Sequence, residues 1–303
     1  MESWFKWLRP KNRAVLGIDI TASAVKIVEI RQDISNASFY LQAHAISPDV
    51  INSNARVAVL AISDTAVITK TIQIDNDFSL SDPLTPEMDE NILLQAYQAM
   101  PFSVNEINLD FNILGIANET ESKIDVLVVA SKTEQINNRM RLAKQVGLNP
   151  VIIDVESYAA ARSIQYLSKK LPGYTKEKLI ILINFDLLFV YYYIFNSINV
   201  VFTYNEKHNN HEQLEYILLR IERVLNLFYA TRPSGTIMHC FIAGYIEFWP
   251  NMAVSVQETC HISTSIANPL DYLQISDNLA SELDWQTATK LIIACGLALR
   301  AFA

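Results

Sequence analysis

One pattern occurs twice in this chain, and it constrains the fold more than any other feature. Near the start, the apolar run Val15-Leu-Gly-Ile-Asp19 ends at a small polar residue and precedes a turn and a returning strand. The run Ile180-Ile-Leu-Ile-Asn184 opens the same succession later in the chain. A supersecondary unit that recurs within one chain indicates internal duplication. The sequence therefore predicts two similar α/β halves that face each other across a cleft.

Hydrophobic periodicity predicts the individual elements. Short apolar or alternating segments predict strands, and apolar spacing of i, i+3, i+4 predicts helices. Pro101 and Gly147 mark the ends of two helices, because proline disfavours helix before it and glycine caps a helix in the left-handed region. Strands are expected over residues 15–20, 24–30, 38–45, 57–62, 66–74, 106–116, 124–130, 151–155, 179–183, 189–195, 198–204 and 238–243, and helices over residues 88–100, 133–146, 156–170, 212–229 and 285–302.

Breaks in the pattern suggest a domain division. Pro172-Gly173 interrupts the chain just before the pattern repeats. We therefore expect a first half over residues 14–172 and a second half over residues 173–303. The aromatic and basic residues of segment 1–13 predict a flexible terminus, with contact to an anionic membrane surface as the less favoured alternative.

Composition excludes several classes of protein. Of the 303 residues, 50% are hydrophobic and 18% are charged, so the chain can bury a core and is not intrinsically disordered. The net charge of −8 argues against a nucleic-acid partner. Three separate cysteines without a CxxC pair favour a reducing compartment. The best candidate for a membrane span, residues 179–202, is interrupted by Asn184, Asp186, Asn196 and Asn199, which favours buried strands over a membrane helix and predicts a soluble protein.

Four stretches of sequence resemble a known family. The chain is similar to the PilM family of type IV pilus assembly, within the actin-like ATPase fold that actin, FtsA and the heat-shock chaperones share. The stretch Ala96–Phe102, followed by Glu106–Phe111, is the most specific of the four, because FtsA and the chaperones lack it. The others are Gly17–Ile30, then Val128–Ser131 with Gly147-Leu148 and Asp154-Val-Glu156, and finally Ala294–Arg300.

The resemblance implies a fold and a set of partners. The expected fold is α/β and actin-like, with duplicated β-β-β-α halves around a central cleft, an inserted α+β subdomain over about residues 60–148, and a second half trimmed at the short segment 205–211. The family implies a cytoplasmic scaffold, peripheral to the inner membrane, that holds the N-terminal cytoplasmic tail of a PilN-like membrane protein. It also implies contacts with other platform or motor proteins of the pilus machine.

The resemblance also implies a place for a nucleotide. Asp19, Ser23 and Lys26 match the first phosphate motif, and Asp186 falls within the phosphate motif of the second half. Gly244 falls in the late turn, where the family has two or three glycines that face the adenine and this chain has one. Glu156 falls at the position of the hinge-side acid, which would be catalytic only in a working ATPase. An acid that opens a helix and interacts with the helix dipole is an equally good interpretation of this residue.

Several departures indicate that this site is degenerate. Asn184 replaces the metal-side acid of the family, and Asp186 replaces a glycine, which adds bulk and negative charge where a phosphate would lie. Tyr245 would fill space that adenine needs, whereas Thr21 in place of another glycine is tolerable, because its hydroxyl can still donate. The chain has only 7 glycines, although loops that press against phosphate usually need them. We therefore expect no catalytic residue, no metal site, and no cofactor or only weakly bound Mg-ATP.

Two other functions remain as alternatives. One is an ATP-dependent switch in which Asp19, Glu156 and Asp186 hold Mg-ATP. The other is a cytoplasmic component of a related type II secretion platform. Two further local patterns have ordinary interpretations: His208 and His211 are expected in a polar turn rather than at a metal, and Tyr191-Tyr192-Tyr193 in a strand with alternating burial.

Overall fold

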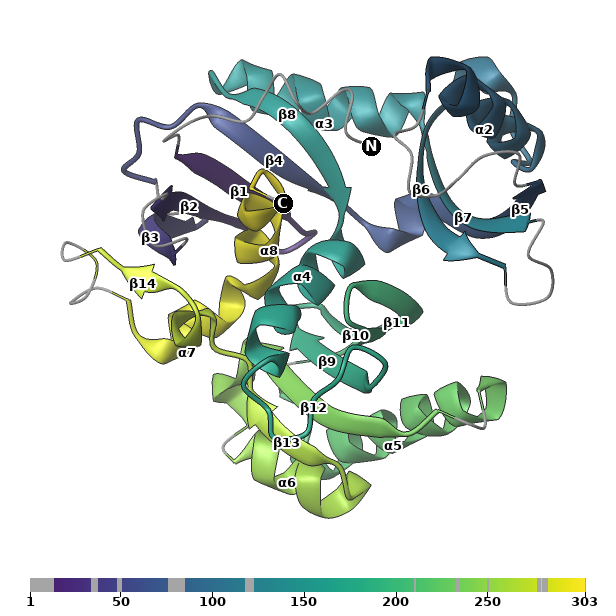
Figure 1. Cartoon of the computed structure of the whole chain (residues 1–303). Helices are drawn as coiled ribbons and strands as arrows, with labels where there is room; N and C mark the ends of the chain where they lie inside the picture. Colours follow the sequence, from purple (N-terminus) through teal and green to yellow (C-terminus); the bar gives the residue numbers. More distant parts are fainter. Residues whose placement is uncertain are drawn as a thin grey trace. The chain divides into compact units, whose positions relative to one another are not determined.

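The chain forms two compact units. The computed structural model describes residues 14–33, 38–47, 51–75, 85–117, 123–209, 211–232, 235–249, 251–276, 279 and 283–302. The predicted flexible segment 1–13 lies outside these residues. Residues Ile62–Val146 belong to unit 1, and the other described residues, on both sides of that segment, belong to unit 2 (Figure 1).

Unit 1 is a three-stranded antiparallel sheet with helices. Strands β5 (Val67–Asp75), β7 (Lys123–Lys132) and β6 (Ile107–Ile116) lie side by side in that order. The helix α2 (Pro86–Gln98) packs Ile92 and Ala96 against the sheet, and α3 (Thr133–Gln145) follows β7 directly. Thr85 caps α2 by accepting a hydrogen bond from the Met88 N–H, and this cap starts the helix two residues before the predicted position.

Unit 2 contains two sheets that share one topology. The first sheet has the order β14-β3-β2-β1-β4-β8, and the second has the order β11-β10-β9-β12-β13. In each, three consecutive antiparallel strands are extended by a parallel strand beside the first of the three. The strands are β1 (Val15–Ile20), β2 (Val25–Asp33), β3 (Ser38–Ile46), β4 (Val57–Ile62), β8 (Asn149–Val155), β9 (Leu179–Phe185), β10 (Phe189–Asn196), β11 (Asn199–Lys207), β12 (Ile237–Gly244), β13 (Ser263–Ile266) and β14 (Gln274–Ile275). β1 and β9 therefore occupy equivalent places, which confirms the predicted duplication.

Two helices, α4 (Glu156–Ser168) and α8 (Ile292–Arg300), join the two sheets of unit 2 in one hydrophobic core. This core takes residues from both sheets and both helices, including Val15, Val59, Ala160, Ile164, Leu182, Phe241, Ile293 and Leu297. The remaining helices of unit 2 are α5 (Leu214–Thr231), α6 (Met252–Cys260) and α7 (Trp285–Lys290).

Two glycines allow the backbone of α8 to lie in direct contact with the backbones of β1 and α4. A Cβ on Gly17 of β1 would lie 2.0 Å from the carbonyl oxygen of Ala294. A Cβ on Gly296 of α8 would lie 1.9 Å from the carbonyl oxygen of Ala159 in α4. Ser163 of α4 adds a hydrogen bond of 2.6 Å from its hydroxyl to the carbonyl oxygen of Ile292. The small residues Ala294, Gly296 and Ala298 of α8 therefore serve this close packing.

Several details differ from the sequence predictions. The single helix predicted over residues 285–302 is wrong, because the chain leaves helical geometry at Leu291 (φ −96°, ψ 4°) and forms α7 and α8. Thr289 of α7 donates to the carbonyl oxygen of Gly244 at the end of β12, whereas α8 packs on β1, so the two helices dock on different sheets. The predictions did not include α6, β13 or β14.

The tyrosine strand was also predicted with the wrong burial. Tyr192 and Tyr193 are each 1% exposed, and their side chains belong to different cores. Both faces of β10 are therefore covered, so its burial does not alternate.

Within the described residues, no helix has the length and apolar content that crossing a bilayer requires.

Substituting Gly17 tests the close packing of α8. Gly17→Ala places a methyl group against the Ala294 backbone, which cannot move as a side chain can, and we expect a loss of roughly 3 kcal/mol in the free energy of unfolding. Gly235→Ala is the matched control, because the atom nearest to its Cβ would be the flexible end of the Leu179 side chain, at 2.8 Å, and its backbone contact, with the Arg232 carbonyl oxygen, would be an ordinary 3.6 Å. Urea denaturation measures both, and equal losses would contradict the proposed role of Gly17.

Candidate functional site

The turn between β1 and β2 is stabilised by hydrogen bonds from the hydroxyl groups of its own residues. The Thr21 N–H donates to the carbonyl oxygen of Ala24 at 3.0 Å, and the Thr21 hydroxyl donates to the same oxygen at 3.2 Å. The Thr21 hydroxyl also lies 3.1 Å from the Ser23 hydroxyl. This turn fixes Ser23 beside the end of β1, and Thr21, where the family has a glycine, takes part in it.

Lys26 lies buried between two carboxylates at the place where both sheets end. Asp19 is its cross-strand neighbour, and Asp186 directly follows β9 in the second sheet. The Lys26 Nζ is 3.5 Å from Asp19 Oδ2 and 3.4 Å from Asp186 Oδ1. The Ser23 hydroxyl donates to Asp186 Oδ2 at 2.6 Å. We call these four residues the Lys26 cluster; its three charged members are each 1% exposed.

The charges of the cluster stabilise one another. Burial alone would lower the pKa of Lys26, but Asp19 and Asp186 outweigh burial and raise this pKa above its ordinary value. Burial would likewise raise the pKa of Asp186, but the Lys26 charge and the Ser23 hydrogen bond lower it below its ordinary value. The ammonium and the Asp186 carboxylate are therefore both charged at neutral pH.

A buried histidine contacts the backbone of Asp186. The His208 Nε2 lies 2.5 Å from the Asp186 backbone carbonyl oxygen. The His208 ring packs against Phe185 and Trp249, at centroid distances of 6.1 and 5.5 Å. The polar-turn interpretation of His208 is therefore wrong, because its ring is 8% exposed and holds the main chain of the site. Its local sequence gave no signal of this, since Trp249 lies far along the chain.

Gly244 and Tyr245 bring β12 against the end of β9. Gly244 has φ +91°, and a Cβ there would lie 1.9 Å from the carbonyl oxygen of Phe185. The next N–H, from Tyr245, donates to the same oxygen at 2.9 Å. The Tyr245 ring centroid is 5.8 Å from Lys26 Nζ and 4.6 Å from Lys290 Nζ. Gly244 is thus required by the packing of two strands, and Tyr245 borders the Lys26 cluster.

The six predicted site residues divide into three groups. Asp19, Ser23, Lys26 and Asp186 are in direct contact, although they come from both halves of the sequence. Gly244 lies beside them at the end of β12. Glu156 is the first residue of α4 and is 4% exposed, and a carboxylate at this position is favoured by the helix dipole.

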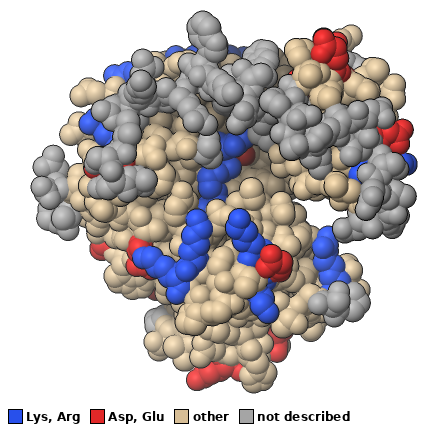
Figure 2. Space-filling model, in the orientation of Figure 1, with Lys and Arg blue, Asp and Glu red and all other residues tan. Residues whose placement is uncertain are grey.

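Basic side chains gather on the surface of unit 2 near α4. The segment between α4 and β9 carries Lys169, Lys170, Lys176 and Lys178, all exposed, and Figure 2 shows several basic side chains in the middle of this face. The chain as a whole has a net charge of −8, so this positive segment is a local departure. The sequence pattern does not mark this segment as a basic run, because the lysines are interrupted by Pro172-Gly173 and by Glu177.

The charge of Asp186 predicts an acid-dependent loss of stability. A carboxyl group whose pKa is lowered by folding stabilises the protein above its unfolded pKa, about 3.9, and this contribution is lost as the pH falls through the folded pKa. The difference in unfolding free energy between wild type and Asp186→Asn should therefore be constant from pH 5 to 7 and shrink below about pH 4.

Urea denaturation between pH 3 and 7 measures this difference. Glu258→Gln, which changes an exposed carboxylate on α6, is the control and should show no comparable change. A gap between wild type and Asp186→Asn that did not shrink in acid would show that the Lys26–Asp186 ion pair does not stabilise the fold.

Several solved structures are similar to this chain. The solved structure of a PilM-PilN type IV pilus biogenesis complex matches with a TM-score of 0.71 and 19% identity, over 95% of this chain and 98% of that chain. A Bacteroides thetaiotaomicron protein described as having an actin-like ATPase fold matches with a TM-score of 0.42 and 9% identity, over 88% of this chain and 95% of that chain. The ethanolamine utilization protein EutJ of Carboxydothermus hydrogenoformans matches with a TM-score of 0.40 and 10% identity, over 96% and 90%.

The fold is the mixed α/β actin-like ATPase fold that the sequence predicts. The sequence model of the family described as type IV pilus assembly protein PilM matches residues 49–215 and 211–302, which is most of the chain. The chain therefore belongs to the PilM family of type IV pilus assembly proteins.

Proposed function

We propose that this protein is a scaffold of type IV pilus assembly, in which the actin-like cleft binds ATP weakly or not at all. It captures the N-terminal cytoplasmic tail of a PilN-like inner-membrane protein. It lies in the cytoplasm at the inner membrane, held there by that partner, and contacts other platform or motor proteins. The observation that carries the proposal of weak or no ATP binding is the Lys26 cluster, in which Lys26 is paired with Asp19 and Asp186 and the Ser23 hydroxyl is bonded to Asp186.

Electrostatics argues against a nucleotide in the cluster. Two carboxylates and one ammonium leave the group with one excess negative charge, since +1 − 2 = −1. A polyphosphate would bring further negative charge next to Asp19 and Asp186, and like charges in a poorly solvated site repel by several kcal/mol. Lys26, which would otherwise attract phosphate, is already paired twice.

The hydrogen-bond donors support the same conclusion. The Ser23 hydroxyl donates to Asp186 at 2.6 Å and would have to break this bond to reach a phosphate. Gly244 packs against Phe185, so its missing side chain is explained without a ligand. Glu156 then acts as a buried helix-terminal acid, and no catalytic role is assigned to it.

For the tail, we favour strand addition at β6 of unit 1. Among the described residues, β6 pairs with β7 alone, so one edge of this strand is available to an extended peptide. Leu114 and Ile116 near the end of β6 are 44% and 53% exposed and give this edge an apolar surface. β5 at the opposite edge exposes Thr69, Lys70 and Thr71, and such polar and lysine-bearing edges discourage pairing.

The nucleotide part is tested by the melting temperature with and without ~1 mM Mg-ATP. Binding with a dissociation constant of about 10 μM would add roughly 2.7 kcal/mol at that concentration and raise the melting temperature by several degrees. We expect no shift in the wild type. A shift would contradict the degenerate-cleft proposal and favour the ATP-dependent switch, with Asp19, Glu156 and Asp186 as ligands.

A restored variant provides the positive control for this measurement. Asn184→Asp/Asp186→Gly brings back the acid and the glycine of the family pattern, so we expect Mg-ATP to raise its melting temperature. If neither protein responds, residues outside these two positions block the cleft.

The tail is tested by titration with a synthetic peptide. The probe is the N-terminal cytoplasmic segment of the PilN-like protein that the same cell makes, with a scrambled peptide as the control. We expect micromolar binding by isothermal titration calorimetry, because ordering a free tail limits affinity. Leu114→Asp should weaken it about tenfold, whereas Leu188→Asp in unit 2, where Leu188 is 49% exposed, should not. Equal effects would contradict the assignment to β6.

A further inference from the structure

The segment between α4 and β9 carries an excess of positive charge. Residues 169–178, which we call the lysine segment, include the exposed side chains of Lys169, Lys170, Lys176 and Lys178. Within the described residues, none of these lysines forms an ion pair with a carboxylate. Glu177 lies in the segment, and Asp271 lies beside it, because Lys170 donates to the Asp271 carbonyl oxygen. With both acids counted, the charge of this surface is still 4 − 2 = +2.

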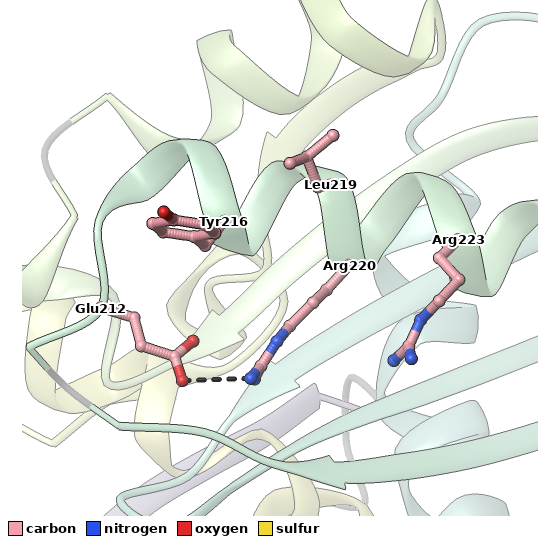
Figure 3. Close-up of a pocket in the computed structure, with 5 residues that line it drawn as sticks. All are labelled: Glu212, Tyr216, Leu219, Arg220 and Arg223. Carbon is pink, nitrogen blue, oxygen red and sulfur yellow. Dashed lines mark ion pairs between the residues drawn. The ribbon is translucent and has the colours of Figure 1, made fainter.

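Basic side chains elsewhere in unit 2 show how such charge is usually balanced. Arg220 and Arg223 line a hollow of about 450 Å³ on α5. Figure 3 shows the guanidinium of Arg220 pointing toward Glu212, and the two groups are 3.1 Å apart. Arg223 forms an ion pair with Glu206. The lysine segment differs from this hollow, and an unbalanced positive surface on a chain with a net charge of −8 favours an anionic ligand.

An exposed apolar side chain lies beside the lysine segment. Ser197 and Ile198 form the two-residue turn between β10 and β11, and Ile198 is 47% exposed. Gln165 of α4 donates to the Ser197 hydroxyl at 2.7 Å. The side chain of Tyr174, in the middle of the lysine segment, also hydrogen-bonds to Ser197. The turn and the lysine segment therefore form one surface.

The turn does not require an isoleucine. Ser197 has φ +52°, and two-residue hairpin turns with positive φ favour Gly, Asn and Asp. A single exposed isoleucine is ordinary on a protein surface. Beside an excess of lysines, however, Ile198 adds what a lipid bilayer binds in addition to charge, since apolar side chains enter the boundary between headgroups and acyl chains. An acidic protein or a nucleic acid would be attracted by the lysines alone.

We propose that the lysine segment and Ile198 bind the surface of an anionic lipid bilayer. The ammonium groups lie beside the lipid phosphates, and Ile198 inserts between the headgroups. This contact goes beyond the capture of a membrane-protein tail and needs no partner protein. It gives the scaffold a second attachment to the membrane, and two weak attachments on one molecule reinforce each other.

Vesicle co-sedimentation of the whole 303-residue chain tests this contact. Vesicles of phosphatidylcholine with about 30% phosphatidylglycerol provide the anionic surface, and vesicles of phosphatidylcholine alone provide the neutral one. At about 50 mM salt, we expect a partition coefficient at least tenfold higher for the anionic vesicles. Most of this difference should disappear at about 500 mM salt, because salt screens the attraction.

Charge reversal tests the lysines. Lys176→Glu/Lys178→Glu should lower the partition coefficient on anionic vesicles at least tenfold, since each lysine near such a surface contributes roughly a fivefold factor. Arg141→Glu/Lys144→Glu on α3 is the matched control, because it makes the same change of charge at exposed residues of unit 1. This control should stay within about threefold of the wild type.

A neutral substitution tests the apolar part. Ile198→Asn should lower the partition coefficient about fivefold through lost apolar burial, and asparagine suits a turn, so the fold should be kept. Leu188→Asn is the matched control, because Leu188 is 49% exposed and lies between β9 and β10, at the opposite end of β10 from Ile198. Circular dichroism checks that every variant is folded.

Equal binding of the wild type to anionic and neutral vesicles, or no binding to either, would overturn the proposal. Anionic binding that Lys176→Glu/Lys178→Glu retains would assign the contact to another basic segment, such as residues 1–13. Equal effects of Ile198→Asn and Leu188→Asn would remove the role of Ile198 and favour an acidic protein as the ligand. Because the vesicles contain no protein, failure here leaves tail capture intact, and a tail that does not bind leaves this contact intact.

Discussion

A buried ammonium group must be neutralised by whatever surrounds it, and in this protein the neutralising groups come from two different sheets. Lys26 and Asp19 belong to the first sheet and Asp186 to the end of the second, so the ion cluster spans the duplicated halves of unit 2. Leaving any one of these charges unpaired in the interior is costly, commonly by 3–5 kcal/mol. The arrangement of β1, β2 and β9 is therefore tied to this cluster, and so are the side chains that border it, Ser23 from the first half and Tyr245 from the second.

The hydrophobic core around α4 and α8 holds the two sheets of unit 2 together. α8 lies against β1 at Gly17 and against α4 at Gly296, and both contacts are too close for any side chain. Through these contacts α8 packs directly on β1, which carries Asp19, and on α4. The mutual pairing of Lys26 and Asp186 is the reason why we propose a scaffold rather than a nucleotide-driven switch.

Most of the fold could be predicted from the sequence, because its strands are strongly apolar. β1 and β4 begin and end where periodicity placed them. α6, β13 and β14 were missed, since the two strands have four and two residues and carry little apolar pattern. The break at Leu291 was missed because no glycine or proline marks it.

For the site, resemblance identified Asp19, Ser23, Lys26 and Asp186. The pairing of Lys26 with Asp186 could not be predicted from local sequence, because the two residues are 160 positions apart. The contact between His208 and the Asp186 backbone could not be predicted for the same reason. The division of the chain at residue 172 stays a prediction.

The central claim is that Lys26 and Asp186 neutralise each other across the two halves, and a double-mutant cycle measures this most directly. The unfolding free energies of wild type, Lys26→Met, Asp186→Asn and the double variant give the coupling energy between the two side chains. We predict a coupling of at least about 2 kcal/mol, with the double variant more stable than the sum of the single losses implies. Effects that add to within about 0.5 kcal/mol would contradict the account, because they would show that the two charges do not depend on each other.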